Sequence, residues 1–145
     1  GVDSRSKLIH SVVATPANVH DSQVLPALLH GNETRVWGDS AYTGQKTKIK
    51  AVAPHAKDFT QAKGARNRKL TEKERAMNRT KSRVRSKVEH SFGIIKRQFG
   101  FTKVRYRGLE KNTHRLVVAC ALSNLVMAKK VLLKPGRLKP QATCA

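Results

Sequence analysis

The sequence contains few acidic residues. Nine Asp and Glu stand against 30 Lys and Arg in 145 residues, so the formal net charge is +21 at pH 7. Positive charges in this number repel one another and lower the stability of the folded chain unless a polyanion neutralises them. Nucleic acid does so effectively, because each phosphate neutralised by Lys or Arg releases counterions. The composition therefore favours a nucleic-acid partner over an anionic membrane surface.

Cysteine and long apolar runs are also scarce. The two cysteines, Cys120 and Cys144, are too few for a disulfide framework or a zinc site of cysteines. We expect Cys120 to be buried in a helix and the chain to work in the reducing cytoplasm. The longest apolar run, 116–122, is too short to cross a bilayer, and no signal peptide is visible. The first residue is Gly rather than Met, so we expect part of a longer protein.

Hydrophobic patterning and capping residues predict one mixed α/β domain over residues 1–133, followed by a disordered basic tail at 134–145. The strongest local signal is a capping box of Thr71 and Glu74, which opens a long helix to about Gln98. The other predicted elements are a hairpin at 2–15 with its turn at 3–6, a short helix within 18–31 capped by Asp21 or Ser22 and ended by Gly31, a buried strand at 35–38, a short helix running into a strand from 48–53, and a buried helix from Asn112 or Thr113 to about Leu133.

Glu89 lies in the long helix among basic residues. At 100° per residue it falls at the border of the apolar face, one turn after Arg85, where partial burial beside cations would favour the ionised carboxylate. The alternative is an ordinary i, i+4 ion pair on a solvated helix, worth about 0.2–0.5 kcal/mol. The predicted core face comprises Val84, Val88, Phe92, Ile95 and Phe99, and the charged arc beside it comprises Ser82, Arg85, Glu89 and Lys96.

Asp39 is a second carboxylate in an informative position. It follows the predicted buried strand and precedes a glycine-containing loop, and open α/β sheets place their chemistry beyond strand ends. The alternative is an Asx turn or a helix cap. Oxygen ligands from Asp39 and Glu89 would suit Mg²⁺ or Mn²⁺. Two such ions about 4 Å apart can activate a water or a 3′-hydroxyl for attack on a phosphodiester.

Three segments carry a family resemblance: "GVDSRSKLIHSVVATPANVHDSQVLPALLHG" at 1–31, "VWGDSAYTG" at 36–44, and "NRTKSRVRSKVEHSFGIIKRQFGFTKVRYRGLEKN" at 78–112. Together they resemble the C-terminal part of the catalytic domain of a bacterial DDE-type insertion-sequence transposase, of the insertion-sequence-five-like group. The resemblance implies an RNase H-like fold, two Mg²⁺ or Mn²⁺ ions, and DNA strand cleavage followed by strand transfer. It makes Asp39 the second catalytic acid and Glu89 the third, and it matches Arg85 and Lys96 to family positions. Ser82 stands where the family often has Tyr.

The resemblance also implies a missing acid. In the family the first catalytic Asp lies on a strand upstream of the hairpin, and Asp3 in the hairpin turn does not match it. We therefore expect an incomplete RNase H-like fold that lacks its first strand, and no transposase activity from this chain alone. The expected partners are DNA, the missing N-terminal part of the transposase, and a second copy of the chain if it forms a homo-oligomer.

Further residues are candidates for DNA contact. Tyr42 could stack on a flipped base or pack under its own loop. The candidates for contact with the DNA backbone are Arg66, Arg68, Lys69, Lys103, Arg105 and Arg107. Two rival hypotheses remain: a basic DNA- or RNA-binding module without catalysis, and a solvated helix face with Asp39 and Glu89 far apart.

Overall fold

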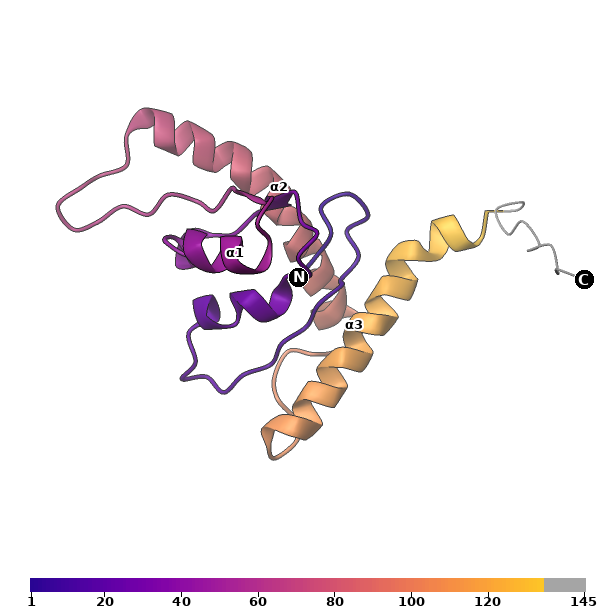
Figure 1. Ribbon diagram of the computed structural model, residues 1–145. Helices are drawn as coiled ribbons and strands as arrows, with labels where there is room; N and C mark the ends of the chain where they lie inside the picture. The colour runs from indigo at the N-terminus through magenta and orange to yellow at the C-terminus, as the bar shows by residue number, and fades with distance from the viewer. Residues whose placement is uncertain (135–145) are drawn as a thin grey trace, which may run out of the picture.

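The computed structural model describes residues 1–134 and shows a mixed arrangement of helices with a two-stranded sheet (Figure 1). The mixed α/β class is therefore confirmed, whereas residues 135–145 of the tail predicted at 134–145 lie outside the described residues. The elements are three 3₁₀ turns, η1 (Asp21–Gln23), η2 (Leu25–Leu28) and η3 (Ser40–Tyr42), two strands, β1 (Arg35–Val36) and β2 (Lys57–Asp58), and three helices, α1 (Lys46–Val52), α2 (Glu72–Arg97) and α3 (Leu109–Leu132).

The sheet is small, parallel and joined by a helical crossover. β1 pairs with β2 in the register Arg35 to Lys57 and Val36 to Asp58, and α1 lies between them in the chain. Hydrogen bonds extend this pairing, because Gln61 N–H donates to the Gly38 carbonyl at 3.0 Å. The regular strand, Arg35–Val36, is shorter than the strand predicted at 35–38. Its extended pairing nevertheless reaches the residue before Asp39.

A first hydrophobic cluster packs under this sheet. The Ile49 side chain of α1 is fully buried, and Val36 of β1 and Leu25 of η2 pack in the same cluster. Ala53 and Ala56 complete it, while Leu29 and Tyr42 are partly buried against it. The cluster holds the end of β1, and with it Asp39, on a packed base.

The region at 18–31 departs from the predicted helix. It forms two 3₁₀ turns, and the cap of the first is His20, whose Nδ1 accepts a hydrogen bond from Ser22 N–H at 3.2 Å, rather than Asp21 or Ser22. Pro26 lies at the start of η2 and has no backbone N–H. It therefore cannot donate the hydrogen bond that would join the two turns into one α-helix. Gly31 adopts a φ of 93°, which favours glycine and suits the predicted stop.

The predicted hairpin at 2–15 is reduced to its tip. One antiparallel bridge joins Val2 to Ile9, and the turn lies at 4–6. The Asp3 carboxylate accepts hydrogen bonds from the Ser6 hydroxyl and backbone N–H, which lower the pKa of Asp3 to about 2. Beyond this bridge the backbone groups of Gly1 still bond those of His10 and Ser11, and from Val12 onwards the segment no longer pairs with residues 1–3.

Helix α2 begins where the sequence predicts. The Thr71 hydroxyl accepts from Glu74 N–H, and the Glu74 carboxylate accepts from Thr71 N–H at 2.9 Å, which completes the capping box. The helix ends at Arg97, and Gly100 follows with a φ of 59°. Both predicted boundaries of this helix are therefore confirmed to within one or two residues.

We expect Thr71→Ala to lower the free energy of unfolding by about 1 kcal/mol, because it removes the cap from the first turn of α2. Thr80→Ala is the matched control, since Thr80 lies exposed inside the same helix and bonds the Ala76 carbonyl. Urea unfolding followed by circular dichroism measures both. Equal effects of the two substitutions would contradict the assigned cap.

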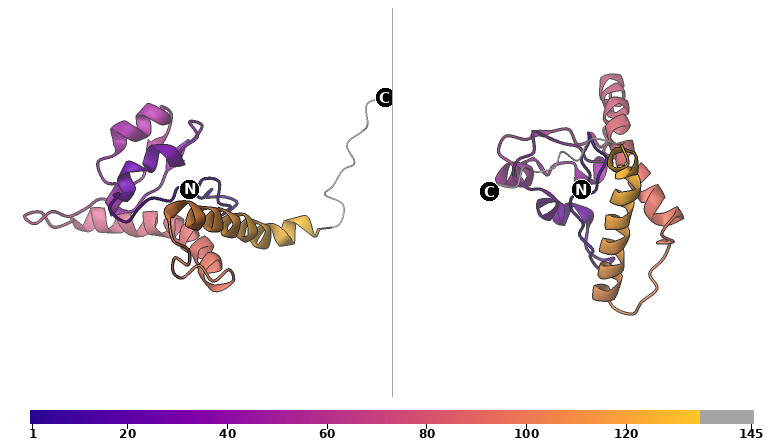
Figure 2. Two further views of the ribbon diagram at one scale, coloured as in Figure 1. Left: turned by 90° about the horizontal axis from the view of Figure 1, so that it is seen from below. Right: turned by 90° about the vertical axis from the view of Figure 1, so that its right-hand side faces the viewer.

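The second hydrophobic cluster lies where α2, α3 and the N-terminal segment meet. Ile95 packs with Ala119 and the predicted core residue Cys120, whose burial raises the pKa of its thiol. Figure 2 shows α2 and α3 extending to opposite sides of this junction. Asn124 of α3 ties in the N-terminal segment, because its side chain accepts from Ile9 N–H at 2.8 Å and donates to the Ile9 carbonyl at 2.7 Å.

The predicted core face of α2 is correct only in part. Phe99 and Ile95 pack in the second cluster and Val84 and Val88 are half-buried, but Phe92 is 51% exposed. Ser91 is buried instead, where its hydroxyl donates to the Lys7 carbonyl at 3.3 Å. The N-terminal segment covers this side of the helix, and a helical wheel of α2 contains no information about where that segment lies.

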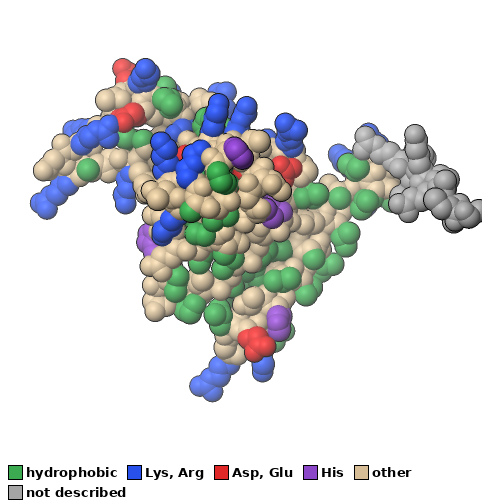
Figure 3. All heavy atoms as spheres, viewed as in Figure 1, with side chains coloured by type: hydrophobic (Ala, Val, Ile, Leu, Met, Phe, Trp, Pro, Cys, Tyr) green, Lys and Arg blue, Asp and Glu red, His purple; other side chains and the backbone are tan. Residues whose placement is uncertain are grey.

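Two predictions about the last helix are wrong. It begins at Leu109 after Gly108, three residues early, because Asn112 is buried and its side chain binds Tyr106 and Gly108 backbone groups. It is also largely exposed rather than buried, as the hydrophobic side chains in Figure 3 show. The exposed apolar residues of α3 are Leu109, Val117, Val118, Leu122, Leu125, Val126, Val131 and Leu132.

No helix among residues 1–134 is long and apolar enough to span a membrane.

Candidate active site

Asp39 stands at the end of the β1 pairing and caps η3. Its Oδ1 accepts a hydrogen bond from Ala41 N–H at 2.8 Å. Asp39 is therefore a helix cap, as one of the two interpretations of the sequence predicts. The cap uses one oxygen only. The other, Oδ2, faces α2, where it lies 3.9 Å from Nη1 of Arg85. Asp39 therefore combines a structural contact with a carboxylate oxygen that is available for another partner.

Glu89 reaches the same guanidinium from the helix side. Its Oε1 lies 3.0 Å from Nη2 of Arg85, so the i, i+4 ion pair is also realised. Asp39 and Glu89 thus contact a single side chain, which excludes the alternative in which the two acids lie far apart. The predicted partial burial of Glu89 is wrong, because its side chain is 61% exposed. The side of α2 that carries Glu89 is left open by both hydrophobic clusters.

The two acids reach the same guanidinium because the segment after β2 is bound along α2. Gln61 is central: its N–H bonds the Gly38 carbonyl beside Asp39, and its side chain donates to the Ser82 hydroxyl at 2.6 Å. One turn earlier in α2, Asn78 bonds both backbone groups of Ala62 at 3.0 Å. The candidate residue Ser82 therefore ties the sheet to the helix. Sequence reasoning missed Gln61 and Asn78, which carry no local signal of these distant contacts.

We expect Gln61→Ala to lower the free energy of unfolding by about 1–2 kcal/mol, because the substitution removes hydrogen bonds to Ser82 and to the Asn78 carbonyl. The exposed Gln98 gives a matched control, since Gln98→Ala should change stability by less than about 0.5 kcal/mol. Denaturant titration measures both values. A loss no larger than that of the control would show that the contact does not hold the sheet to α2.

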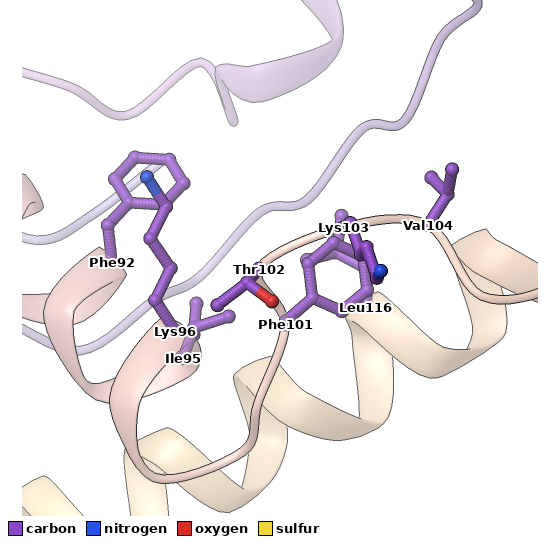
Figure 4. Close-up of a pocket in the computed structure, with 8 residues that line it drawn as sticks. All are labelled: Phe92, Ile95, Lys96, Phe101, Thr102, Lys103, Val104 and Leu116. Carbon is purple, nitrogen blue, oxygen red and sulfur yellow. The ribbon is translucent and has the colours of Figure 1, made fainter.

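Lys96 lies two turns after Glu89 beside open hollows. One hollow of about 330 Å³ is lined by Glu89, Phe92, Gly93, Lys96 and Arg97. A second hollow of about 350 Å³ lies beyond Lys96 between α2 and α3. Figure 4 shows the side chains that line this second hollow, which are Phe92, Ile95, Lys96, Phe101, Thr102, Lys103, Val104 and Leu116. Cationic and aromatic side chains therefore surround open space next to one of the two acids.

The other basic candidates fall into two groups at the two ends of α2. Arg66 and Lys69 are exposed in the loop before the helix, whereas Arg68 is already paired with Glu74. Arg115, which the sequence did not single out, stacks its guanidinium 4.9 Å above the Phe101 ring and donates to the Gly100 carbonyl at 2.9 Å. The exposed basic residues in the connection after α2 are Lys103, Arg105 and Arg107.

Tyr42 packs against the first hydrophobic cluster. Burial raises the pKa of its hydroxyl, and the nearby negative charges of Asp21 and Asp39 raise this pKa further. The ring is therefore held under its own loop in this structure, beside Asp39.

The donor set at this position suits a hard divalent ion. Asp39 and Glu89 both offer carboxylate oxygens, which Mg²⁺ and Mn²⁺ prefer, and Mg²⁺ usually takes one or two carboxylates and completes its shell with water and phosphate. Within residues 1–134 no cluster of three or more Asp, Glu, His and Cys residues could hold a metal. Asp39 and Glu89 therefore offer oxygen ligands of the kind that such an ion prefers, but they are two carboxylates and not three.

Comparison with known proteins identifies a family. No solved structure matches the chain. A family model described as the transposase DDE domain matches residues 1–125, which include both acids, Arg85 and Lys96. Members of this family act on DNA and generally use divalent metal ions. The chain belongs to the transposase DDE domain family.

Proposed function

We propose that this chain forms the C-terminal part of the catalytic domain of a bacterial insertion-sequence transposase of the insertion-sequence-five-like group. Asp39 and Glu89 are two of its catalytic, metal-binding acids. The observation that carries the proposal is the contact of both carboxylates with the guanidinium of Arg85, at 3.9 and 3.0 Å. The two acids are 50 positions apart, and the chain has 30 Lys and Arg for only nine acids. A scarcity of cations therefore does not explain why both acids contact the same Arg.

The reaction is strand cleavage by water followed by attack of the new 3′-hydroxyl on target DNA. Two Mg²⁺ or Mn²⁺ ions, when bound, activate the attacking oxygen and stabilise the leaving oxygen. Oδ2 of Asp39 and the carboxylate of Glu89 would supply ligands, while Oδ1 of Asp39 accepts from Ala41 N–H and fixes the orientation of the group. Lys96 lines the hollow beside Glu89 and neutralises a phosphate placed there.

We infer that this site is completed by a third carboxylate on a strand outside this chain. The domain, residues 1–133, would then be a partial RNase H-like fold, with the two-stranded parallel sheet as part of a larger one. The chain alone should not cleave DNA, since one ligand is missing from its metal site. The complete transposase would act on DNA in the bacterial cytoplasm, alone or as a homo-oligomer.

The basic groups at the two ends of α2 support a long DNA interface. A 26-residue helix is about 39 Å long, close to the roughly 34–36 Å of one turn of B-DNA. Side chains before and after α2 could therefore contact phosphates on either side of the acids. Such contacts position the duplex without reading its sequence. The proposed contacts are Arg66, Arg68, Lys69, Lys103, Arg105 and Arg107.

The experiment that tests this function compares two proteins on DNA that carries inverted repeats, in the presence of Mg²⁺. This chain alone should produce no cleavage. The chain preceded by its upstream genomic sequence, provided that sequence encodes a strand carrying Asp, should cleave at the repeat ends. Cleavage by the chain alone would contradict the missing acid, and binding without cleavage by the longer protein would favour a non-catalytic DNA- or RNA-binding module.

A further inference from the structure

We propose that Arg85 is a placeholder cation. Its guanidinium occupies the place that a divalent ion takes between Asp39 and Glu89, and the ion binds by displacing it. This inference rests on the proposed function, because it assumes that the two acids are metal ligands. It adds a defined role for Arg85 in the metal-free state.

The first support is that the guanidinium and the ion would use the same oxygens. Nη2 of Arg85 lies 3.0 Å from Oε1 of Glu89, and Nη1 faces Oδ2 of Asp39. A Mg²⁺ ion sits about 2.0–2.1 Å from its oxygen ligands. Arg stays charged in proteins, so an ion bound between the acids would repel the guanidinium at very short range. The two cations therefore exclude one another.

The second support is that Arg85 is held loosely enough to exchange. The contact with Asp39 is 3.9 Å, which is too long for a hydrogen bond, and the side chains of Asp39 and Glu89 are 41% and 61% exposed. Ion pairs with this much exposure contribute little stability. In addition, Nε of Arg85 is buried without a hydrogen-bond partner among the described residues. A buried donor without a partner destabilises the structure. Moving the Arg85 side chain out of this position would therefore remove part of that free-energy cost.

The third support is the electrostatic repulsion between the two carboxylates, which a cation between them offsets. Without a cation between them, two carboxylates at one site repel one another. A guanidinium presents several donors in a fixed fork, so one side chain can face two carboxylates at once. Arg85 therefore offsets the repulsion between the two acids until a metal replaces it.

Mn²⁺ titration of the purified chain, followed by electron paramagnetic resonance, tests the inference. Arg85→Gln keeps a polar side chain but removes the competing charge, and it should bind Mn²⁺ about threefold to tenfold more tightly than the unsubstituted chain. Arg83→Gln is the matched control, because it removes the same charge from an exposed residue of the same helix. It should change the affinity by less than about twofold. Circular dichroism shows whether each variant is folded.

The opposite result would overturn the placeholder role. If Arg85 merely orients Glu89 for the metal, Arg85→Gln will bind Mn²⁺ equally or more weakly. Should Arg85→Gln fail to fold, Arg85→Lys replaces it, since an ammonium cannot present the fork to both acids. This variant should still bind more tightly than the unsubstituted chain, and equal or weaker binding would again overturn the inference.

Glu89→Gln separates this inference from the proposed function. Loss of Mn²⁺ binding in that variant, without a gain in Arg85→Gln, would reject the placeholder and keep the metal site. Binding that appears only after Arg85→Gln would support the placeholder strongly. Mn²⁺ binding that Glu89→Gln leaves unchanged, or no binding by any variant, would reject the metal site and the placeholder with it.

Discussion

Glu89→Gln is expected to reduce DNA cleavage about 10³-fold or more in a transposase that contains this chain together with the missing acid. Gln has nearly the shape of Glu but no charge, so the substitution removes a proposed metal ligand and leaves the helix intact. Metal ions contribute several kcal/mol to stabilising the transition state of phosphodiester displacement, and about 4 kcal/mol corresponds to 10³-fold in rate. Single-turnover cleavage of inverted-repeat DNA measures the loss.

The control for this loss is Glu110→Gln. Glu110 is exposed in the first turn of α3, and the substitution changes the net charge equally. It should leave cleavage within about twofold, since surface substitutions away from a site have small effects. DNA affinity should be unchanged or slightly higher in both variants, because each removes a negative charge from a DNA-binding protein. Cleavage by Glu89→Gln within tenfold of the unsubstituted protein would contradict the catalytic role.

The second large effect concerns salt. We expect the affinity of the chain for duplex DNA to fall about 10³-fold or more between 50 and 200 mM salt, as it does for proteins with roughly six or more phosphate contacts. The reason is the surplus of 30 Lys and Arg over nine acids, which gives binding a large counterion-release term. Fluorescence anisotropy at several salt concentrations measures the slope of log affinity against log salt.

A triple substitution tests where these contacts lie. Replacing Lys103, Arg105 and Arg107 with Ala should reduce the magnitude of the salt slope by about three, roughly one for each lost phosphate contact. Lys129 and Lys130 at the end of α3 provide a control, because their replacement also lowers the charge. It should change the slope far less. Equal changes per charge removed would show that binding follows net charge rather than the proposed surface.

The elements that could be predicted are those with local causes. The capping box of Thr71 and Glu74, the length of α2, the short helix before β2 and the position of Asp39 after β1 all follow from neighbouring residues. At the site, the sequence predicted the two acids and Arg85 but left their contacts open. The family match over residues 1–125 confirms the family level of that interpretation.

What could not be predicted depends on which segment covers which face. The apolar sequence of α3 predicts burial, yet most of its apolar side chains are exposed, because a helix pattern does not specify whether a partner is present. For the same reason Phe92, which was predicted in the core, is exposed, and its neighbour Ser91 is buried. Gln61 reaches Ser82 across 21 positions, and Asn124 reaches Ile9 across 115. Such contacts have no signature in a short window of sequence.

Nuclear magnetic resonance shows whether Asp39 and Glu89 bind one ion, because Mn²⁺ broadens the signals of nearby nuclei. If Asp39 and Glu89 share the ion, substoichiometric Mn²⁺ should broaden the backbone amide signals around both residues together, and Asp39→Asn should remove the broadening at both places. Broadening near only one of them, or centred on remote acids such as Glu72 and Glu110, would contradict a shared metal site.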